Sequence, residues 1–226
     1  MATPGEDKQA FMDRIRSVLQ RDPSTAVETP PAVDESIIRL ASREDDLFDL
    51  AMRNIEAVSM KPQRVTLATL PETLHTLLDT IQPKTAAVSE AALGRLFDVA
   101  GVLDARGIER IASSDGNFRA QFAADVGLTD VRAVLAETGT LVVATDASHS
   151  RGPSLVPPIH IAIARASDIV PDMLDVYAGL KGLPPRELPS SIAYITGPSK
   201  TADIEGMLVQ GIHGPQTVHV LLVEDA

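Results

Sequence analysis

The chain of 226 residues contains no cysteine and no tryptophan. Without cysteine it forms no disulfide, no thiolate zinc site and no cysteine-ligated iron–sulfur cluster, and it has no cysteine nucleophile. A chain free of cysteine also fits a reducing compartment, so we expect a cytoplasmic protein. These absences exclude several kinds of chemistry without indicating any.

Basic and aromatic residues are scarce. Lys and Arg together number 20 against 31 Asp and Glu, which gives a formal net charge of −11, and the aromatics are five Phe and two Tyr. Nucleic acids are bound by cations that neutralise phosphates and by aromatic rings that stack on bases. We therefore expect no nucleic-acid partner.

Long apolar runs are also lacking. No stretch of 18 or more apolar residues occurs, so we expect no membrane span. The first residues are charged and lack the apolar core of a signal peptide. The composition predicts a soluble globular protein of one or two domains.

Residues 1–60 are predicted to form an N-terminal helical arm. Apolar residues stand at helical spacing in two places, at Phe11, Ile15, Val18 and Leu19 and again within 42–60. Between them lies a connector, 21–36, which is rich in Pro, Ser, Thr and acidic residues. An amphipathic arm of this kind packs either against the core of its own chain or against a partner subunit.

Residues 61–226 are predicted to form an α/β domain, because short β-branched runs alternate with helical segments. The predicted strands are 64–70, 85–89, 107–113, 159–164, 191–195 and 218–223. The predicted helices are 71–81, 90–99, 171–180 and 201–210. Two further runs, 132–136 and 140–144, flank a glycine turn and indicate either a hairpin or a sharp strand corner. This alternation favours a largely parallel sheet flanked by helices.

In parallel sheets ligands bind at the carboxyl ends of strands, beside helix N-termini. The strand 191–195 ends in such a turn, and a helix is predicted to follow it. The candidate residues of this segment are Thr196, Gly197, Ser199, Thr201, Asp203 and Glu205. Free backbone amides there would suit a phosphate or a carboxylate. The alternative is a capped helix start whose two acids complement the helix dipole, with no ligand.

Two other turns are candidates. Gly211–Pro215 contains His213 and Gly214, and the histidine is either a base or a structural hydrogen-bonding residue. The turn of Glu137, Thr138, Gly139 and Thr140 offers a carboxylate beside two hydroxyls. Glu137 is either a general base, a nucleophile or a ligand clamp, or it is an exposed residue of a surface turn.

Other sites find less support in the sequence. The histidines have neither H-x-x-x-H nor H-x-H spacing, so we expect no metal site. No G-x-S-x-G elbow is present, which argues against an α/β-hydrolase triad. No flavin or nicotinamide fingerprint is present either, and we predict no cofactor in this chain.

The motifs together resemble the LUD-domain family, and within it the lactate utilization protein C group (LutC or YkgG). The matching segments are Glu137-Thr138-Gly139-Thr140, Pro157-Pro158-Ile159-His160-Ile161, the run from Ile195 to Glu205, Gly211-Ile212-His213-Gly214-Pro215, and the closing strand. The resemblance covers roughly residues 62–226. It implies a NagB/RpiA/CoA-transferase-like fold, which agrees with the alternation of strands and helices.

The resemblance also implies a function. A protein of this group would support the oxidation of L-lactate to pyruvate together with iron–sulfur partner proteins. The clusters would be on those partners, and a small carboxylate or phosphate would bind at the motif residues, with Glu137 and His213 as catalytic candidates. Two alternatives stay open: a stand-alone enzyme of CoA-transferase-like fold acting on a phosphorylated or carboxylate small molecule, or a ligand-sensing module.

Overall fold

The computed structural model describes residues 7–19, 34, 37–112, 118–146, 150–204 and 207–226. By their contacts the residues fall into two compact units, 1–38 and 39–226. In the first unit, helix α1 (Lys8–Leu19) has no buried residue. Most of the predicted connector, 21–36, lies outside the described residues. None of the helices in the described part of the chain has both the length and the apolar character that a membrane crossing needs.

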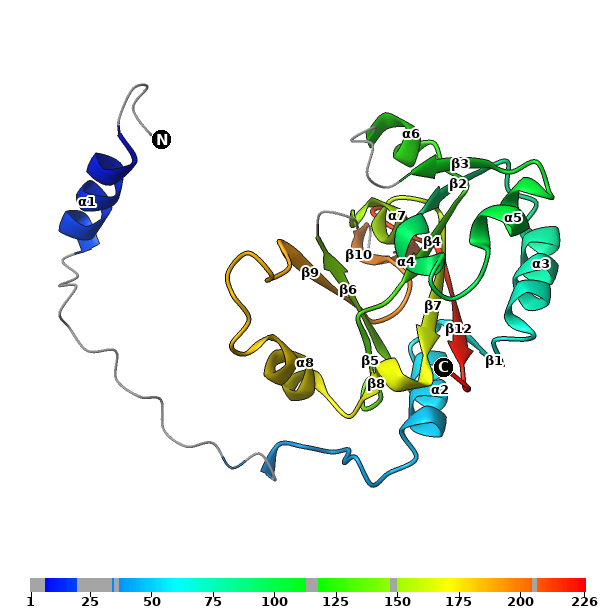
Figure 1. Ribbon diagram of the computed structural model, residues 1–226, viewed down its shortest axis with the longest axis horizontal. Helices are drawn as coiled ribbons and strands as arrows, with labels where there is room; N and C mark the ends of the chain where they lie inside the picture. Colours follow the sequence, from blue (N-terminus) through cyan, green and yellow to red (C-terminus); the bar gives the residue numbers. More distant parts are fainter. Residues whose placement is uncertain (1–6, 20–33, 35–36, 113–117, 147–149, 205–206) are drawn as a thin grey trace. The chain divides into compact units, whose positions relative to one another are not determined.

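The second unit is built on a six-stranded parallel sheet (Figure 1). Its strands are β1 (Lys61–Val65), β2 (Thr85–Val88), β3 (Glu109–Ala112), β4 (Val126–Asp130), β7 (Ile159–Arg165) and β12 (Thr217–Val223). Their order across the sheet is β1-β12-β7-β4-β2-β3, and every pairing is parallel. The central strand β7 is buried over most of its length. This sheet confirms the predicted α/β class.

Helices α3 (Leu70–Ile81) and α5 (Val99–Asp104) cover one face of this sheet. Leu70, Leu74, Leu77 and Leu78 lie on one face of α3 and are all buried. They pack with Leu128, Ile161 and Leu221 of the sheet in the first core cluster. Pro71 stands in the first turn of α3, where its missing N–H costs no hydrogen bond.

A second sheet covers the other face. Its strands β5 (Ala133–Leu135), β6 (Thr140–Thr145), β8 (Ile169–Val170) and β9 (Ser191–Ile195) lie in the order β8-β5-β6-β9. Strands β5 and β6 form the predicted hairpin. Together with α2 (Leu47–Ala57), this sheet packs on the large sheet in the second core cluster. Helix α8 (Met173–Leu180) packs on the outer face of the second sheet through Val176.

Short helices complete the unit. They are α4 (Glu90–Leu93), α6 (Phe118–Phe122), α7 (Gly152–Leu155) and the 3₁₀ turn η2 (Ala166–Asp168). The helix predicted at 90–99 is therefore wrong in its extent, because the chain turns between α4 and α5. The strand predicted at 64–70 ends at Val65, where hydrogen bonds between Thr66 and Thr69 form a turn before α3.

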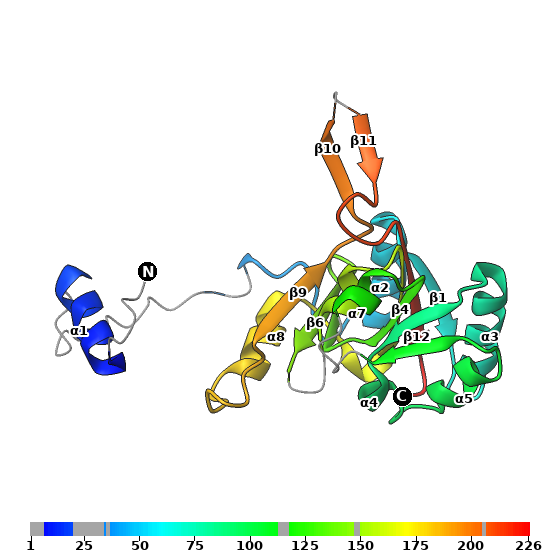
Figure 2. The same cartoon turned by 90° about the horizontal axis from the view of Figure 1, so that it is seen from above.

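The helix predicted at 201–210 is wrong. This segment forms an antiparallel hairpin of β10 (Lys200–Ile204) and β11 (Met207–Gln210), which stands away from the rest of the unit (Figure 2). Thr201, Ile204 and Val209 are β-branched and favour strands, and over so short a run the helical spacing does not outweigh them. The hairpin is closed at its base, where the Gly211 amide donates to the carbonyl of Ser199 at 2.9 Å.

Helix α2 is the helix predicted within 42–60. Ala51 and Ile55 on its inner face are fully buried in the second core cluster. Of the two alternatives for this part of the arm, packing against the core of its own chain is the one that the structure shows. The sequence predicts an arm that extends to residue 60, whereas the contacts in the structure group residues 39–60 with the sheets that follow.

Candidate functional site

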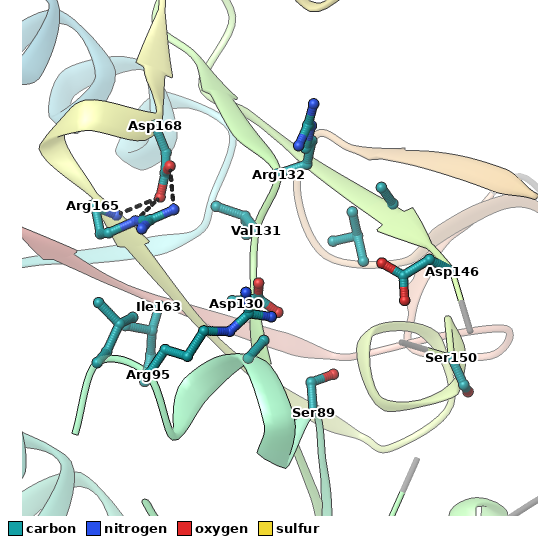
Figure 3. A pocket seen from close by; sticks show the side chains of 14 residues that line it. Ser89, Arg95, Asp130, Val131, Arg132, Asp146, Ser150, Ile163, Arg165 and Asp168 are labelled. Atoms are coloured by element: carbon teal, nitrogen blue, oxygen red, sulfur yellow. Dashed lines mark hydrogen bonds and ion pairs between the residues drawn. The ribbon is translucent and has the colours of Figure 1, made fainter. Parts of the chain in front are cut away.

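A cavity of about 310 Å³ opens at the carboxyl ends of β2, β4 and β7 (Figure 3). Ser89 directly follows β2, Asp130 is the last residue of β4, and Arg165 is the last residue of β7. Val143 and Ala144 of the second sheet form part of the wall. Parallel sheets bind ligands at this end of their strands, and ligand pockets have volumes of about 300–1,000 Å³. The cavity is therefore the candidate ligand site.

Charges of both signs line the cavity in equal number. The charged residues are Arg95, Arg132, Arg165, Asp130, Asp146 and Asp168. Leu96, Val131, Val143 and Ile163 supply apolar surface between them. With three cations and three anions, the lining has no formal net charge. Such a site can orient a small polar molecule and also contact an apolar part of it.

Arg165 and Asp168 form an ion pair at the edge of the cavity. The guanidinium donates two hydrogen bonds of 2.9 Å to the carboxylate, and the Arg165 amide donates a third of 3.1 Å. These hydrogen bonds raise the pKa of Arg165, and burial offsets part of the rise. The nearby carboxylate of Asp130 raises the pKa of Arg165 further. Asp168 therefore neutralises the positive charge of Arg165.

Two other polar groups of the lining have no protein partner within the described part of the chain. Ser89 is 2% exposed, and its amide is fixed to the carbonyl of Leu128 at 3.0 Å, but its hydroxyl makes no hydrogen bond there. The exposed side chain of Arg132 makes no hydrogen bond or ion pair there either, although its amide donates to Val142 at 2.7 Å. The cavity thus offers the Ser89 hydroxyl to a ligand, whereas the Arg132 side chain points away from Ser89 (Figure 3).

Two of the sequence-predicted segments meet at a different place. The hydroxyl of Thr138 lies 2.7 Å from that of Thr140, which in turn lies 2.8 Å from the hydroxyl of Thr196. The turn between β5 and β6 and the turn after β9 are thereby joined through side chains. Thr140 is buried, whereas Thr138 and Thr196 are exposed.

A glycine in each of these two turns lets the C-terminal end of α2 pack closely against the turn. The Asn54 side-chain amide donates to the carbonyls of Ala136 at 2.7 Å and Glu137 at 2.9 Å. A Cβ at Gly139, whose φ is +65°, would overlap the backbone of Asn54 and its neighbour. A Cβ at Gly197, whose φ is +107°, would lie 2.6 Å from the carbonyl oxygen of Val58. Both glycines therefore let their turns approach protein backbone closely.

The third predicted segment adjoins Ser199. The Ser199 amide donates to the carbonyl of Pro215 at 2.8 Å, and a Cβ at Gly214 would lie 3.2 Å from that of Ser199. The imidazole of His213 is on an exposed residue. Of the remaining candidates, Thr201 and Asp203 belong to β10, and Glu205 lies outside the described residues. Because no helix begins here, the expected anion site at a helix N-terminus is not formed.

The predicted residues and the cavity lie at opposite ends of the large sheet. The Gln216 amide donates to Pro158 at 2.7 Å, just before β12 and β7 begin, and Val58 lies just before β1. Strand β6 runs from this end toward the cavity, a distance of about 15 Å at roughly 3.3 Å per residue. None of the predicted residues that the structure describes lines the cavity. Their part in ligand binding stays a prediction.

The cavity residues were missed for a simple reason. The motifs in the sequence indicate glycine turns, whereas Ser89, Asp130 and Arg165 are single polar residues at the ends of apolar strands. A polar residue that closes each of several buried strands was the signal that could have located the site. Which strands are neighbours, and hence which of these ends meet, came only from the tertiary structure.

Two histidines are buried in the large sheet, outside the cavity. Burial lowers the pKa of His160 to about 3, and its Nε2 lies 2.9 Å from the hydroxyl of Thr129. Burial, together with the charge of Lys61, lowers the pKa of His219 to about 4. Within the described residues, no group of three or more His, Asp and Glu is placed to hold a metal ion.

The sheet order and the cavity define a parallel α/β protein with a candidate small-molecule site at its strand ends. The LUD domain family model matches residues 7–223, nearly the whole chain. The chain belongs to the LUD domain family.

Similar curated proteins carry one name. "Lactate utilization protein C" of Anoxybacillus flavithermus is 28% identical over 222 residues, which covers 96% of this chain and 99% of that protein. "Lactate utilization protein C 1" of Bacillus mycoides is 29% identical over 97% of this chain and 98% of its own. The protein of the same name from Bacillus subtilis is 40% identical over 114 residues, about half of each chain.

A solved structure is similar in fold. The crystal structure of a DUF162 family protein from Deinococcus radiodurans has a TM-score of 0.57 and 19% sequence identity. It covers 79% of this chain and 96% of its own. At this identity the likeness supports the α/β fold alone.

Proposed function

We propose that this chain is a component of an L-lactate utilisation system, which supports the oxidation of L-lactate to pyruvate. The observation that carries the proposal is its similarity to lactate utilization proteins C over 96–97% of this chain and 98–99% of theirs. A match of that extent spans the arm, both sheets and the strand-end cavity. The function therefore belongs to the whole chain.

Within such a system the chain contributes binding. Its 226 residues contain no cysteine and so supply no thiolate ligand for an iron–sulfur cluster. We place the clusters on partner proteins and the small molecule in the strand-end cavity of this chain. Proteins of this kind are expected in the reducing cytoplasm.

Deletion of the gene tests the proposal. The deletion strain is expected to lose growth on L-lactate and to keep growth on glucose, and the wild-type gene supplied in trans should restore growth on L-lactate. Growth of the deletion strain on L-lactate at the wild-type rate would refute the proposal, provided that no second copy is present.

Purification from lactate-grown cells tests the partners. An affinity-tagged chain is expected to retain proteins whose visible absorption and iron content show iron–sulfur clusters. A tagged chain that purifies alone from cells growing on L-lactate would contradict the complex and favour a stand-alone enzyme or a ligand-sensing module.

A further inference from the structure

The two main sheets of this protein end in four edge strands, and one of these strands lacks the protection that the other three have. The edges are β1 and β3 in the six-stranded sheet, and β8 and β9 in the four-stranded sheet. The outermost strand of a sheet carries N–H and C=O groups that can pair with a strand of another chain. Proteins limit such pairing with proline, with charged residues or with very short edge strands.

Three of the edges are protected in these ways. Strand β1 contains Pro62 together with the charged residues Lys61 and Arg64, and β3 contains Glu109 and Arg110. Strand β8 has only two residues. Proline offers no N–H to a further strand, and charged side chains resist removal from water. Pairing with another chain is therefore disfavoured at β1, β3 and β8.

Strand β9 has none of these protections. Its five residues, Ser191–Ile195, include no proline and no charge, and all five are partly exposed. No charged residue occurs from 188 to 199. The strand pairs with β6 on one side, and no strand of the described residues pairs with its other side (Figure 2). The outer edge of β9 is therefore available to a further strand.

Helix α8 adds an apolar surface beside this edge. Ile192 and Tyr194 of β9 pack with Val176 of α8 on the outer face of the second sheet. On the same helix, Met173 is 46% exposed and Tyr177 is 51% exposed. Burial and the neighbouring Tyr177 raise the pKa of Tyr194 to about 12, so the two tyrosines of the chain lie together here. Aromatic residues and methionine are enriched in protein interfaces.

The edge of β9 is complementary to a second copy of itself. When two β9 strands pair antiparallel with Ala193 opposite Ala193, each Ile192 lies opposite the Tyr194 of the other copy. A β-branched residue opposite an aromatic residue is a stabilising cross-strand pair. Two identical strands in this arrangement are related by a two-fold axis, which is the commonest symmetry of protein dimers.

The distribution of charge also favours a second copy at this edge. Each chain carries a formal net charge of −11, so two copies repel each other on average. The run from 188 to 199 carries no charge, so like charges do not face each other where two such runs meet. Two copies can therefore approach along β9 at little electrostatic cost.

We propose that the chain forms a two-fold dimer in which the β9 strands of two copies pair antiparallel and join their four-stranded sheets into one sheet. Met173 and Tyr177 of each copy lie beside the paired strands and lose exposure to water. The inference rests on the edge of the second sheet and does not depend on the proposed function.

Sedimentation of the full chain over a range of concentrations tests the dimer. The mass is expected to rise with concentration from the 24.0 kDa of one chain to twice that value. A mass of one chain at every concentration would overturn the proposal.

Ser191→Lys locates the interface. Lysine on an edge strand hinders pairing, and the substitution acts twice across a two-fold axis, so the dissociation constant of the dimer is expected to rise by about ten-fold or more. Ser167→Lys is the matched control, because Ser167 is exposed and adjoins β8, at the opposite edge of the same sheet. Equal dissociation constants of the two variants would overturn the assignment to β9.

Ala193→Cys locates the two-fold axis. Because the chain contains no cysteine, this variant has a single thiol, which in the proposed register lies opposite its own copy. Opposite residues of an antiparallel pair have Cβ atoms about 4.5–5.5 Å apart, close to the separation in a disulfide. Mild oxidation is expected to give a covalent dimer on a denaturing gel, whereas Ser167→Cys should stay monomeric. No cross-link in the Ala193 variant, or an equal one in the Ser167 variant, would overturn the pairing. Thermal unfolding of each variant shows that it is folded before its association is compared.

Discussion

Glycine residues decide how closely the turns of this protein approach α2. Gly139 combines a positive φ of +65° with a position where a Cβ would overlap the backbone of α2. Gly107 has nearly the same φ, +64°, but no atom lies within 4 Å of the position of a Cβ. Alanine at Gly107 would meet only the cost of the positive φ. Alanine at Gly139 would meet that cost and would also clash with the backbone of α2.

Gly139→Ala is therefore expected to destabilise the fold more than Gly107→Ala. Both variants place alanine at positive φ, which costs about 1–2 kcal/mol. Gly139→Ala also forces the turn away from α2, which adds about 1–3 kcal/mol, typical of overpacking. Urea unfolding of both variants measures the difference. Equal losses of unfolding free energy would show that the turn moves without cost.

At the scale of elements, α8 holds the segment that precedes α2. Asp175 of α8 accepts hydrogen bonds from Arg39 at 2.5 Å and from Arg43 at 2.6 Å, and Asp172 accepts one from Arg39 at 3.0 Å. Burial by itself raises the pKa of Asp175, but the hydrogen bonds from the two arginines outweigh it and hold the pKa below its ordinary value. These ion pairs therefore join two segments that are more than 130 positions apart in the sequence.

Asp175→Asn should release this segment while the core stays folded. Its carboxylate is 7% exposed and pairs with two arginines, so its loss should lower the free energy of local opening by about 1–3 kcal/mol. Trypsin, which cuts after arginine, then cleaves at Arg39 and Arg43 about ten-fold faster or more.

Glu187→Gln is the control for this experiment. Glu187 is an acid of the same region whose pair with Arg186 is long, at 3.6 Å, and exposed. The Glu187→Gln variant should leave the rate of tryptic cleavage at Arg39 and Arg43 unchanged. If Asp175→Asn is cut no faster than Glu187→Gln, the ion pairs do not hold the segment.

The hairpin β10–β11 shows where element prediction by pattern failed. Its sequence, from Lys200 to Gln210, has residues that suit a helix and residues that suit a strand. Backbone pairing between Thr201 and Val209 decides the outcome, and it depends on how Ser199 and Gly211 meet at the base. This contact joins two turns, and the spacing of apolar residues along the sequence does not predict contacts between turns.

At the scale of the whole molecule, two neutral histidines are built into the large sheet. His160 is fully buried, His219 is 8% exposed, and the Nδ1 atom of each has no partner within the described structure. Protonation would place an uncompensated charge among apolar side chains. Burial therefore lowers the pKa of both, to about 3 and about 4.

Stability should fall as the pH is lowered from about 6.5 to 4. The folded-state pKa values are below the unfolded value of about 6.5, so in this range the unfolded chain binds protons that the native chain does not. The histidine contribution is complete above pH 6.5 and is lost on acidification, by at most about 1.4 kcal/mol per pH unit for each residue. Urea unfolding at several pH values measures it.

His219→Gln should reduce this slope, because one titrating group is removed from the core. His213→Gln is the matched control, since His213 is exposed. A slope that is the same in both variants would show that His219 is not kept neutral by burial.

Much of the fold could be predicted from local pattern. The strands at 85–88, 159–165, 191–195 and 217–223 and the helix at 70–81 follow from apolar runs and from Pro71. The candidate site could not be located in this way. Arg132, Ser89 and Arg165 are far apart in the sequence, and nothing local distinguishes them from other polar residues at strand ends. They line one cavity because β2, β4 and β7 are neighbours in the sheet.

The sequence by itself determined the α/β class, the absence of thiolate chemistry and the family. Those properties depend on composition, on local periodicity and on motifs that are each a few residues long. Only the tertiary structure decided that the motif turns pack on α2 at one end of the sheet while the cavity opens at the other. The physical reason is the order of the strands, because pairing between strands that are distant in the sequence fixes which strand ends lie side by side. The free energy that stabilises this order comes from burial of apolar side chains on both faces of the sheet rather than from any single segment.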